Sequence, residues 1–243
     1  MQAIFKRQEQ KYLLTEKQAT QLVLAFSEYM QQDVHGTYWV QNLYFDTENW
    51  DIINTSIQKP YYKEKMRLRC YGTPETAKYI FLELKKKYAG TVYKRRISLP
   101  TDSLARSLDQ VLEEDGSQIA RELQFHLRSA NVSEKMYVGY RRKAFAGIDD
   151  PSLRLTIDSD ILYRPNELNF ANPSEGNSIL PEHMRLMEIK TASSIPLWLS
   201  HFLSENEIYG ASFSKIGTCF TDYWKKMHQS DIEQHNEGVL LAQ

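Results

Sequence analysis

Basic and apolar residues alternate along several short segments of this chain, and this alternation restricts the fold most. Side chains of a β-strand point to the two faces in turn, so residues two apart share a face. In Lys65–Arg69 every second residue is basic, and Met66 and Leu68 lie between the basic ones. A strand with this sequence has one charged and one apolar face.

Eight segments are rich in β-branched or aromatic residues and are separated by turn signals such as Ala89-Gly90. They are Phe5–Leu14, Tyr38–Asp46, Glu64–Tyr71, Tyr79–Lys87, Thr91–Leu99, Met136–Phe145, Leu153–Leu162 and Met184–Lys190. Mostly sequential strands favour antiparallel pairing, and a closed barrel of eight strands can hold one small ligand. We therefore expect an α+β fold, an eight-stranded antiparallel β-barrel with helices packed outside.

Helices are predicted between and after these strands. Thr15 is a good N-cap, and Gln18 three positions later completes a capping box for the helix that follows the first strand. Further helices are expected within 100–127, at Ile195–Ser204 and around Cys219–Lys226. The residues 1–226 are expected to form a single domain, and the polar residues 227–243 a loose tail.

The overall charge does not indicate a ligand, because 30 basic residues face 31 acidic ones. A polyanion partner must therefore be inferred from where the charges lie. The N-terminus has no apolar h-region, and no segment approaches the roughly 18 apolar residues of a membrane span. We expect a cytoplasmic protein without direct membrane insertion, in which Cys70 and Cys219 are buried, reduced thiols.

The charged faces of the predicted strands together carry mostly cations, and at most one carboxylate each. Their residues include Arg7, Glu9, Lys11, Lys65, Arg67, Arg69, Glu83, Lys85, Lys87, Lys94, Arg96, Arg154, Asp158, Glu188 and Lys190. A sheet with one solvated face would also alternate. Six such strands, with helices to cover the apolar faces, favour a polar interior instead. Arginine binds phosphate oxygens with its planar fork and stays charged when crowded, so the pattern indicates a polyanion-binding barrel.

A triphosphate in such a barrel needs a divalent cation, and Mg²⁺ or Mn²⁺ binds oxygen ligands, often only one or two from protein. Glu188 is the leading candidate ligand, and a local ion pair with Lys190 is the alternative. The other carboxylates are expected to balance charge, Glu9 beside Lys11 and Glu83 beside Lys85, whereas Asp158 fits either role.

No other catalytic pattern is present in the sequence. It contains no Walker P-loop, no dinucleotide-binding glycine fingerprint and no nucleophile elbow, and its six histidines lack metal-ligand spacing. The loop Gly210–Gly217 either directs Lys215 to the barrel mouth or caps a helix, and both interpretations stay open.

Several motifs occur in a fixed order along roughly residues 4–226. They are Arg7-x-Glu-x-Lys11-Tyr12, Leu43-Tyr-Phe-Asp-Thr47, Lys65-x-Arg-x-Arg69, Phe81-Leu-Glu-Leu-Lys85, Val92-x-Lys94-x-Arg96, Tyr140-x-Arg142, Arg154-x-Thr-x-Asp158, Met187-Glu-Ile-Lys190 and Ser212-Phe-Ser-Lys215. In this the chain resembles the polyphosphate polymerase domain of the vacuolar transporter chaperone (VTC) family, a branch of the CYTH-like triphosphate tunnel metalloenzymes.

The resemblance implies roles for individual residues. The expected phosphate-binding residues are Lys11, Arg67, Arg69, Lys85, Lys94, Arg142, Arg154, Lys190 and Lys215, with Arg7, Glu9, Glu83, Arg96, Tyr140, Asp158 and Ser214 in support. It further implies that Glu188 holds the metal. In the sixth strand, alternation alone leaves Tyr140/Arg142 and Arg141/Lys143 equally eligible for the inner face, and the resemblance favours Arg142.

One departure bears on the reaction. The broader superfamily begins Glu-x-Glu-x-Lys, but Arg7 replaces the first glutamate here, which favours keeping a phosphate chain over hydrolysing it. The first hypothesis is therefore a polymerase that transfers the γ-phosphate of ATP to polyphosphate inside a barrel open at both ends.

Two alternatives stay open. One is a tripolyphosphatase or nucleoside triphosphatase, and the other a non-catalytic module that binds polyphosphate or inositol phosphates. Nucleic acid is not expected, because the inward cations lack the exposed aromatics on which single strands stack. The sequence predicts no particular protein partner.

Overall fold

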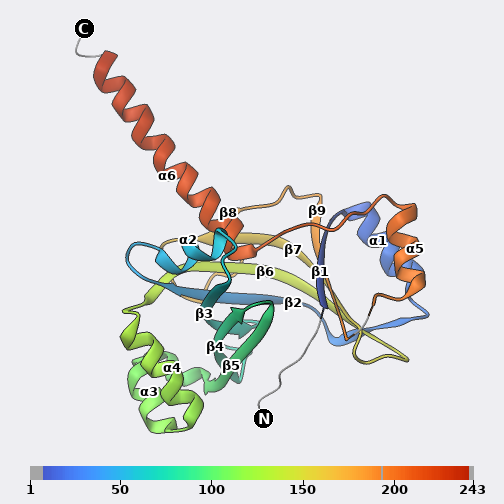
Figure 1. Ribbon diagram of the computed structural model, residues 1–243, viewed down its shortest axis with the longest axis horizontal. Coiled ribbons are helices and arrows are strands. Elements are labelled where there is room, and N and C mark those ends of the chain that lie inside the picture. The colour runs from blue at the N-terminus through green and yellow to red at the C-terminus, as the bar shows by residue number, and fades with distance from the viewer. Residues whose placement is uncertain (1–7, 193, 241–243) are drawn as a thin grey trace.

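The computed structural model describes residues 8–192 and 194–240, with side chains up to residue 229 in the last helix. Within these residues one large antiparallel sheet and six α-helices make up an α+β fold (Figure 1). The strands are β1 (Gln8–Thr15), β2 (Met30–Asp46), β3 (Tyr62–Tyr71), β4 (Tyr79–Tyr88), β5 (Thr91–Pro100), β6 (Ser133–Gly147), β7 (Arg154–Arg164), β8 (Asn177–Ser178) and β9 (Met184–Thr191). Their order is β1-β9-β7-β6-β2-β3-β4-β5, and the short β8 pairs with β7.

All eight predicted strands are confirmed within the described residues, and most of their ends differ from the prediction by a few residues. Residues 5–7 of the first predicted strand lie outside the described residues. The largest difference is β2, which begins at Met30 instead of Tyr38. The hairpin of β4 and β5 turns at Ala89 and Gly90, which have positive φ angles of 48° and 84°. Glycine adopts such angles without steric cost, so the turn signal in the sequence located this hairpin.

The sheet is not closed within the described residues, because β1 and β5 occupy the two ends of the hydrogen-bonded order. The eight-stranded β-barrel is therefore not confirmed. Alternation determines which side chains share a face, whereas closure requires a ladder between the two outermost strands. A segment before the last helix lies along β1 instead: Gly210 pairs with Tyr12, and the Ala211 amide donates to the Lys11 carbonyl over 2.7 Å.

The helices are α1 (Glu16–Ala25), α2 (Asp51–Ile57), α3 (Leu108–Asp115), α4 (Gln118–Ser129), α5 (Leu197–Glu205) and α6 (Lys215–Leu240), with a 3₁₀ helix at Thr101–Ala105. The predicted capping box at the start of α1 is confirmed. The Gln18 amide donates to Thr15 Oγ1 over 3.2 Å, and the Thr15 amide donates to Gln18 Oε1 over 2.9 Å. Both bonds satisfy amides that have no partner within the helix.

Helix α6 begins four residues before the predicted Cys219 and continues to Leu240, across residues expected to be loose. For the backbone of 227–240 that expectation is wrong. Polarity argues against burial but not against helix formation, and this stretch contains glutamate and glutamine but no proline. Figure 1 shows α6 leaving the sheet and extending alone into solvent.

Helices cover the apolar face of the sheet at both ends, as the sequence predicts. Helices α1 and α5 bury Leu14, Leu155 and Leu199 at the β1–β9–β7 end. Helices α3 and α4 bury Leu82 and Leu123 at the β3–β4–β5 end. The opposite face is therefore the one that carries the charged residues. Both cysteines are buried and free, which confirms the predicted thiols.

Helix α6 packs on this opposite face, where its first turns meet apolar strand residues. Ile216 and Phe220 belong to one buried cluster with Met136, Val138 and Leu186. Met136 and Val138 lie on the same face of β6 as Arg142, and Leu186 lies on the same face of β9 as Glu188. One end of the face that carries the charged residues is therefore apolar, and α6 covers it. An interior open at both ends is not supported there.

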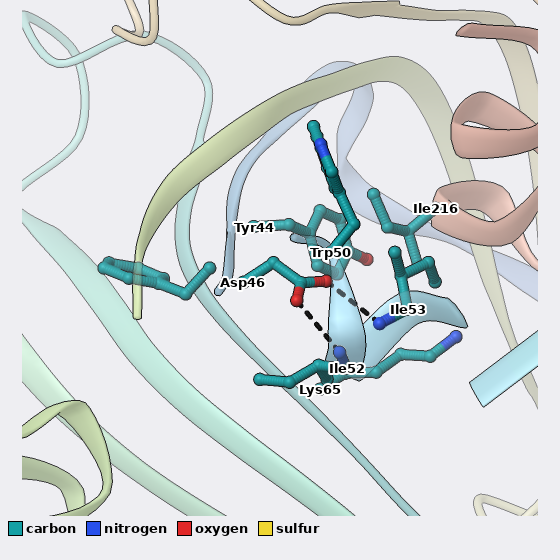
Figure 2. Close-up of a pocket in the computed structure, with 8 residues that line it drawn as sticks. Tyr44, Asp46, Trp50, Ile52, Ile53, Lys65 and Ile216 are labelled. Carbon is teal, nitrogen blue, oxygen red and sulfur yellow. Dashed lines mark hydrogen bonds between the residues drawn. The ribbon is translucent and has the colours of Figure 1, made fainter. Parts of the chain in front are cut away.

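Asp46 joins the end of β2 to the start of α2 (Figure 2). Its carboxylate accepts hydrogen bonds from the amides of Ile52 and Ile53, each over 2.9 Å. These amides lie in the first turn of α2 and lack intrahelical partners. The bonds hold α2 beside a small pocket to which Trp50 and Lys65 contribute, so Lys65 of β3 lies next to α2.

Candidate functional site

Strand register brings the charged residues of the sheet to one continuous face. Facing pairs are Lys11 and Glu188, Thr156 and Glu188, Arg142 and Asp158, Asn42 and Arg69, Arg67 and Glu83, and Lys85 and Lys94. We call the following set the charged face: Glu9, Lys11, Lys65, Arg67, Arg69, Glu83, Lys85, Lys94, Arg96, Arg142, Arg154, Asp158, Glu188, Lys190 and, from the start of α6, Lys215. Cations clearly outnumber carboxylates on it.

Lys215 links two buried carboxylates at the centre of this face. Its Nζ lies 2.7 Å from Asp158 Oδ2 and 2.8 Å from Glu188 Oε1, and its side chain is only 9% exposed. Burial opposes the charged form, but Asp158 and Glu188 outweigh it and raise the pKa of Lys215. Arg142 grips the same aspartate with two bonds, Nε to Oδ1 at 2.7 Å and Nη2 to Oδ2 at 2.8 Å.

Glu188 is surrounded by ammonium groups. Besides Lys215, Lys11 and Lys190 lie 3.6 Å from its carboxylate oxygens. Burial alone would raise the pKa of Glu188, yet the three lysines hold it well below its usual range. The ion pair with Lys190 is therefore present, and the shorter contact is to Lys215.

Glu83 organises a second cluster at the other end of the face. The side chain is 2% exposed, and its oxygens lie 2.7 Å from Arg67 Nη2, 2.6 Å from Lys94 Nζ and 2.7 Å from Arg96 Nε. Burial raises the pKa of Glu83, but Arg67, Arg69 and Lys94 hold it far below its usual range. The predicted partner, Lys85, is wrong, because the register places Lys85 opposite Lys65 and Lys94 instead.

Three residues that sequence reasoning missed orient the arginines. Tyr44 accepts a hydrogen bond from Arg67 Nη1 over 3.0 Å, and Asn42 accepts one from Arg69 Nε over 2.8 Å. Tyr71 accepts from Arg69 over 3.4 Å. Asn42 and Tyr44 are two apart on β2, which is the signal that could have found them, but apolar Val40 shares their face and obscured it.

In β6 the inner pair is Tyr140 and Arg142, as the resemblance implied. Both are buried, and the Tyr140 hydroxyl lies 3.3 Å from Arg69 Nη2, from which it accepts a hydrogen bond. Lys215 Nζ lies 4.6 Å from the centre of the Tyr140 ring. Tyr140 thus connects the Lys215 cluster with the arginines of β3.

Both interpretations of the loop before α6 hold. Ser214 Oγ accepts a hydrogen bond from the Gly217 amide over 3.2 Å and so caps α6, while the next residue, Lys215, points into the face. Lys65 Nζ donates to Ser214 Oγ over 2.9 Å, and Lys11 Nζ donates to the Phe213 carbonyl over 2.9 Å. The loop therefore bridges β1 and β3 across the charged face.

The sequence profile of the VTC domain matches residues 6–221. This chain belongs to the VTC domain family. A search of curated proteins found no match.

Two solved structures share the fold of this VTC domain. An adenylyl cyclase candidate from Hippeastrum, described as having a dominant triphosphatase activity, is 17% identical over 91% of this chain and 96% of that chain, with a TM-score of 0.56. An adenylate cyclase candidate from Bacillus halodurans is 12% identical over 88% and 95%, with a TM-score of 0.52. At these identities the likeness concerns the fold.

Two further predicted residues of the VTC domain, Glu9 and Arg154, lie near the starts of β1 and β7. Glu9 Oε1 lies 3.5 Å from Lys11 Nζ, which is the predicted pairing. Arg154 is exposed and faces Lys190 across the β7–β9 ladder. Arg7 lies outside the described residues. None of the helices described here is long and apolar enough to cross a membrane.

A metal ion fits this VTC domain only if Glu188 and the phosphate ligand hold it together. Among residues 8–192 and 194–229, no group of three or more histidines, cysteines or acids is placed to hold an ion. Glu188 Oε1 already accepts a hydrogen bond from Lys215, and Glu188 Oε2 lies 3.6 Å from Lys190. Mg²⁺ and Mn²⁺ in phosphate sites often take one carboxylate and complete their shell with phosphate and water. Glu188 suits that arrangement, and the residues do not suit an all-protein metal site.

The ammonium group of Lys65 in this VTC domain has an unusually low pKa, and a testable prediction follows from it. Burial, together with Lys63, Lys11, Lys85 and Arg67, lowers the pKa of Lys65 from 10.5 to about 7. In the folded protein it therefore binds fewer protons than in the unfolded chain between about pH 7 and 10.5, so its contribution to stability increases with pH across that window.

A bound polyanion should reverse this shift and draw a proton onto Lys65. At pH 8 we expect tripolyphosphate binding to take up about one proton more in the wild type than in Lys65→Gln. Calorimetry in buffers of different ionisation enthalpy measures this number. Equal proton uptake by the two proteins would show that Lys65 is already charged or does not face the ligand.

Proposed function

We propose that this VTC domain is a metal-dependent polyphosphate polymerase that transfers the γ-phosphate of ATP to a growing polyphosphate chain. The observation that carries the proposal is the charged face, on which arginines held in fixed orientations outnumber the carboxylates that orient them. Such a face is preorganised for a chain of negative groups, because its donors are already aimed before the ligand arrives. Membership of the VTC domain family supports the same ligand class.

The transfer requires little covalent chemistry from the protein. A terminal oxygen of the polyphosphate chain attacks the γ-phosphorus of ATP, the bond from that phosphorus to the β-bridging oxygen breaks, and ADP leaves. The transition state is loose, so alignment and charge stabilisation account for most of the catalysis. A divalent ion at Glu188 would offset phosphate charge when bound.

The arginines and Lys215 supply this alignment. Arg67, Arg69 and Arg142 have planar forks that match phosphate oxygens, and each is held by a carboxylate, an amide or a tyrosine. Lys215 lies between Asp158 and Glu188, so its ammonium group is held in place at the centre of the face.

The carboxylates favour a phosphate acceptor over water. A general base works best when its pKa lies near the working pH. Burial raises the pKa of both Asp158 and Glu188, but neighbouring cations lower both further than burial raises them. Both groups are therefore weak bases, poorly suited to deprotonate an attacking water, whereas a phosphate chain arrives already ionised.

Hydrolysis of tripolyphosphate or a nucleoside triphosphate in the same site is the second candidate. It is favoured by the structural relative from Hippeastrum, which is described as having triphosphatase activity. Hydrolysis and polymerisation share the bond that breaks and differ only in the acceptor, so products distinguish them.

Incubation with ATP and Mn²⁺ or Mg²⁺, read at once for free phosphate and for polyphosphate, tests the proposal. We expect polyphosphate and ADP from the wild type, and at least about 100-fold less from Glu188→Ala, as for loss of a group that stabilises the transition state. Glu122→Ala is the matched control, because Glu122 pairs with Arg95 on the opposite face.

Three outcomes separate the candidates. Free phosphate without chain growth would identify a hydrolase. Binding of polyphosphate with no turnover in any divalent metal would identify a binding module. Polyphosphate made equally by the wild type and Glu188→Ala would remove Glu188 from the site.

A further inference from the structure

Lysines face one another directly on β3 and β4 beyond the Glu83 cluster. The register pairs Lys63 with Lys87 and Lys65 with Lys85. Like charges at directly opposite positions of an antiparallel pair destabilise the sheet. Two such pairs in succession are a cost to folding that a compensating charge should offset.

The protein supplies little of that charge at short range. In the described part of the chain no carboxylate lies within 4.0 Å of the ammonium groups of Lys63, Lys65, Lys85 or Lys87. Glu64, which lies between the first two, points to the opposite face and contacts His126. Glu9 acts on Lys85 only at longer range, and burial and neighbouring cations lower the pKa values of Lys63, Lys65 and Lys85, so a bound anion favours their charged forms.

These four lysines, which we call the lysine track, continue the charged face. Lys65 and Lys63 lie two and four residues from Arg67 along the same face of β3, so Lys63 lies about 13 Å beyond Arg67. Lys85 and Lys87 are exposed and Lys63 is half-buried, so a ligand can reach the track from solvent.

The change from arginine to lysine along β3 suits a ligand that moves. Arg67 and Arg69 are held by Glu83, Tyr44 and Asn42, and so bind phosphate in one orientation. Lysine is a compact charge on a flexible stem that binds phosphate without fixed geometry. A chain can therefore slide over lysines more readily than over oriented arginines.

We propose that the lysine track binds the part of a phosphate chain that extends beyond the triphosphate site, so that affinity depends on chain length. This inference rests on the proposed ligand class but not on the direction of the reaction. Lys65 and Lys85 also belong to the charged face, and Lys63 and Lys87 extend it into a second subsite, with linear inorganic polyphosphate as its ligand.

Binding of tripolyphosphate and of long-chain polyphosphate to Lys63→Gln/Lys87→Gln tests the lysine track. We expect the long chain to bind about 10-fold more weakly than to the wild type, and tripolyphosphate to bind within about twofold. The slope of the logarithm of affinity against the logarithm of salt concentration should become shallower by about 1.4 for the long chain. This takes about 0.7 for each lost lysine–phosphate contact, as for a flexible single strand. Glutamine keeps the length of the side chain and removes only the charge.

Lys17→Gln/Lys86→Gln is the matched control. Lys86 lies between Lys85 and Lys87 on β4 but on the other face, near Glu122, and Lys17 is exposed on α1. This variant loses the same charge and should bind both ligands like the wild type. A similar loss in the control would attribute the effect to net charge and overturn the lysine track.

Comparison of the different ligands distinguishes the remaining results of this binding experiment. If Lys63→Gln/Lys87→Gln binds the long chain like the wild type, the lysine track is wrong while the proposed function stands. If the wild type binds neither phosphate ligand, the proposed function itself is wrong. Tyr61 and Tyr88 are exposed near the track, so a single-stranded oligonucleotide is a third arm; binding as tight as that of polyphosphate would overturn the assignment to polyphosphate.

Discussion

Lys215→Met is expected to lower the free energy of unfolding by about 3–5 kcal/mol at pH 7, the cost of removing one partner from a buried ion pair. The substitution leaves Asp158 with Arg142 alone and Glu188 with Lys11 and Lys190 at 3.6 Å. The remaining cations then do not fully offset the negative charge of these two buried carboxylates. Urea unfolding of the two proteins measures the difference.

The pH dependence of this loss has a definite sign. In the wild type, cations including Lys215 lower the folded pKa values of Asp158 and Glu188 below their ordinary values of 3.8 and 4.5, although burial raises them. Their stabilisation is therefore present above about pH 4.5 and is lost as the pH falls through the folded values. The deficit of Lys215→Met should be full at pH 7 and should shrink below about pH 4.

Lys226→Met is the matched control for this prediction. Lys226 lies on the same helix and pairs with Asp222 one turn away, but it is 51% exposed. Exposed pairs of this kind contribute about 0.3–0.5 kcal/mol. A loss in Lys215→Met no greater than in Lys226→Met would show that Lys215 does not bridge the two carboxylates.

Glu83→Gln is expected to cost about 3–5 kcal/mol as well, for the opposite reason. Glu83 is the carboxylate among Arg67, Lys94 and Arg96, so its removal leaves three cations close together without an anion. A bound phosphate chain supplies the missing negative charge. Tripolyphosphate should therefore raise the melting temperature of Glu83→Gln more than that of the wild type.

Glu122→Gln serves as the control for Glu83→Gln. Glu122 also contacts two cations, Arg95 and Lys86, but it is 33% exposed and lies on the opposite face. Its replacement should cost less than about 1 kcal/mol, and tripolyphosphate should stabilise it as it stabilises the wild type. If tripolyphosphate fails to stabilise Glu83→Gln, the cluster does not lie in the ligand site.

The charged face was predictable because the period of a strand is two residues and leaves no freedom. Lys65, Arg67 and Arg69 share a face whatever their partner strand is. The partner itself depends on register, which alternation does not contain. For this reason Glu83 was assigned to Lys85, its neighbour on the same face, while the register placed it opposite Arg67.

Two other features required information that no local pattern holds. Lys215 reaches Asp158 and Glu188 from the start of a helix, and the sequence alone left open whether its loop directs it inward or caps a helix. Closure of the sheet depends on whether β1 and β5 can form a ladder, and segment 210–214 lies along β1 instead. Long-range contacts of this kind leave no periodic signal in the sequence.

Calorimetric titration of the wild type and of Arg67→Ala with tripolyphosphate tests the central claim, that the charged face is a phosphate-chain site. We expect saturable binding to the wild type that weakens steeply as salt increases, because counterions are released from the ligand. Arg67→Ala should bind at least about 10-fold more weakly, since Arg67 is fully oriented by Glu83 and Tyr44. Undetectable binding to the wild type, or equal binding to both proteins, would contradict the account.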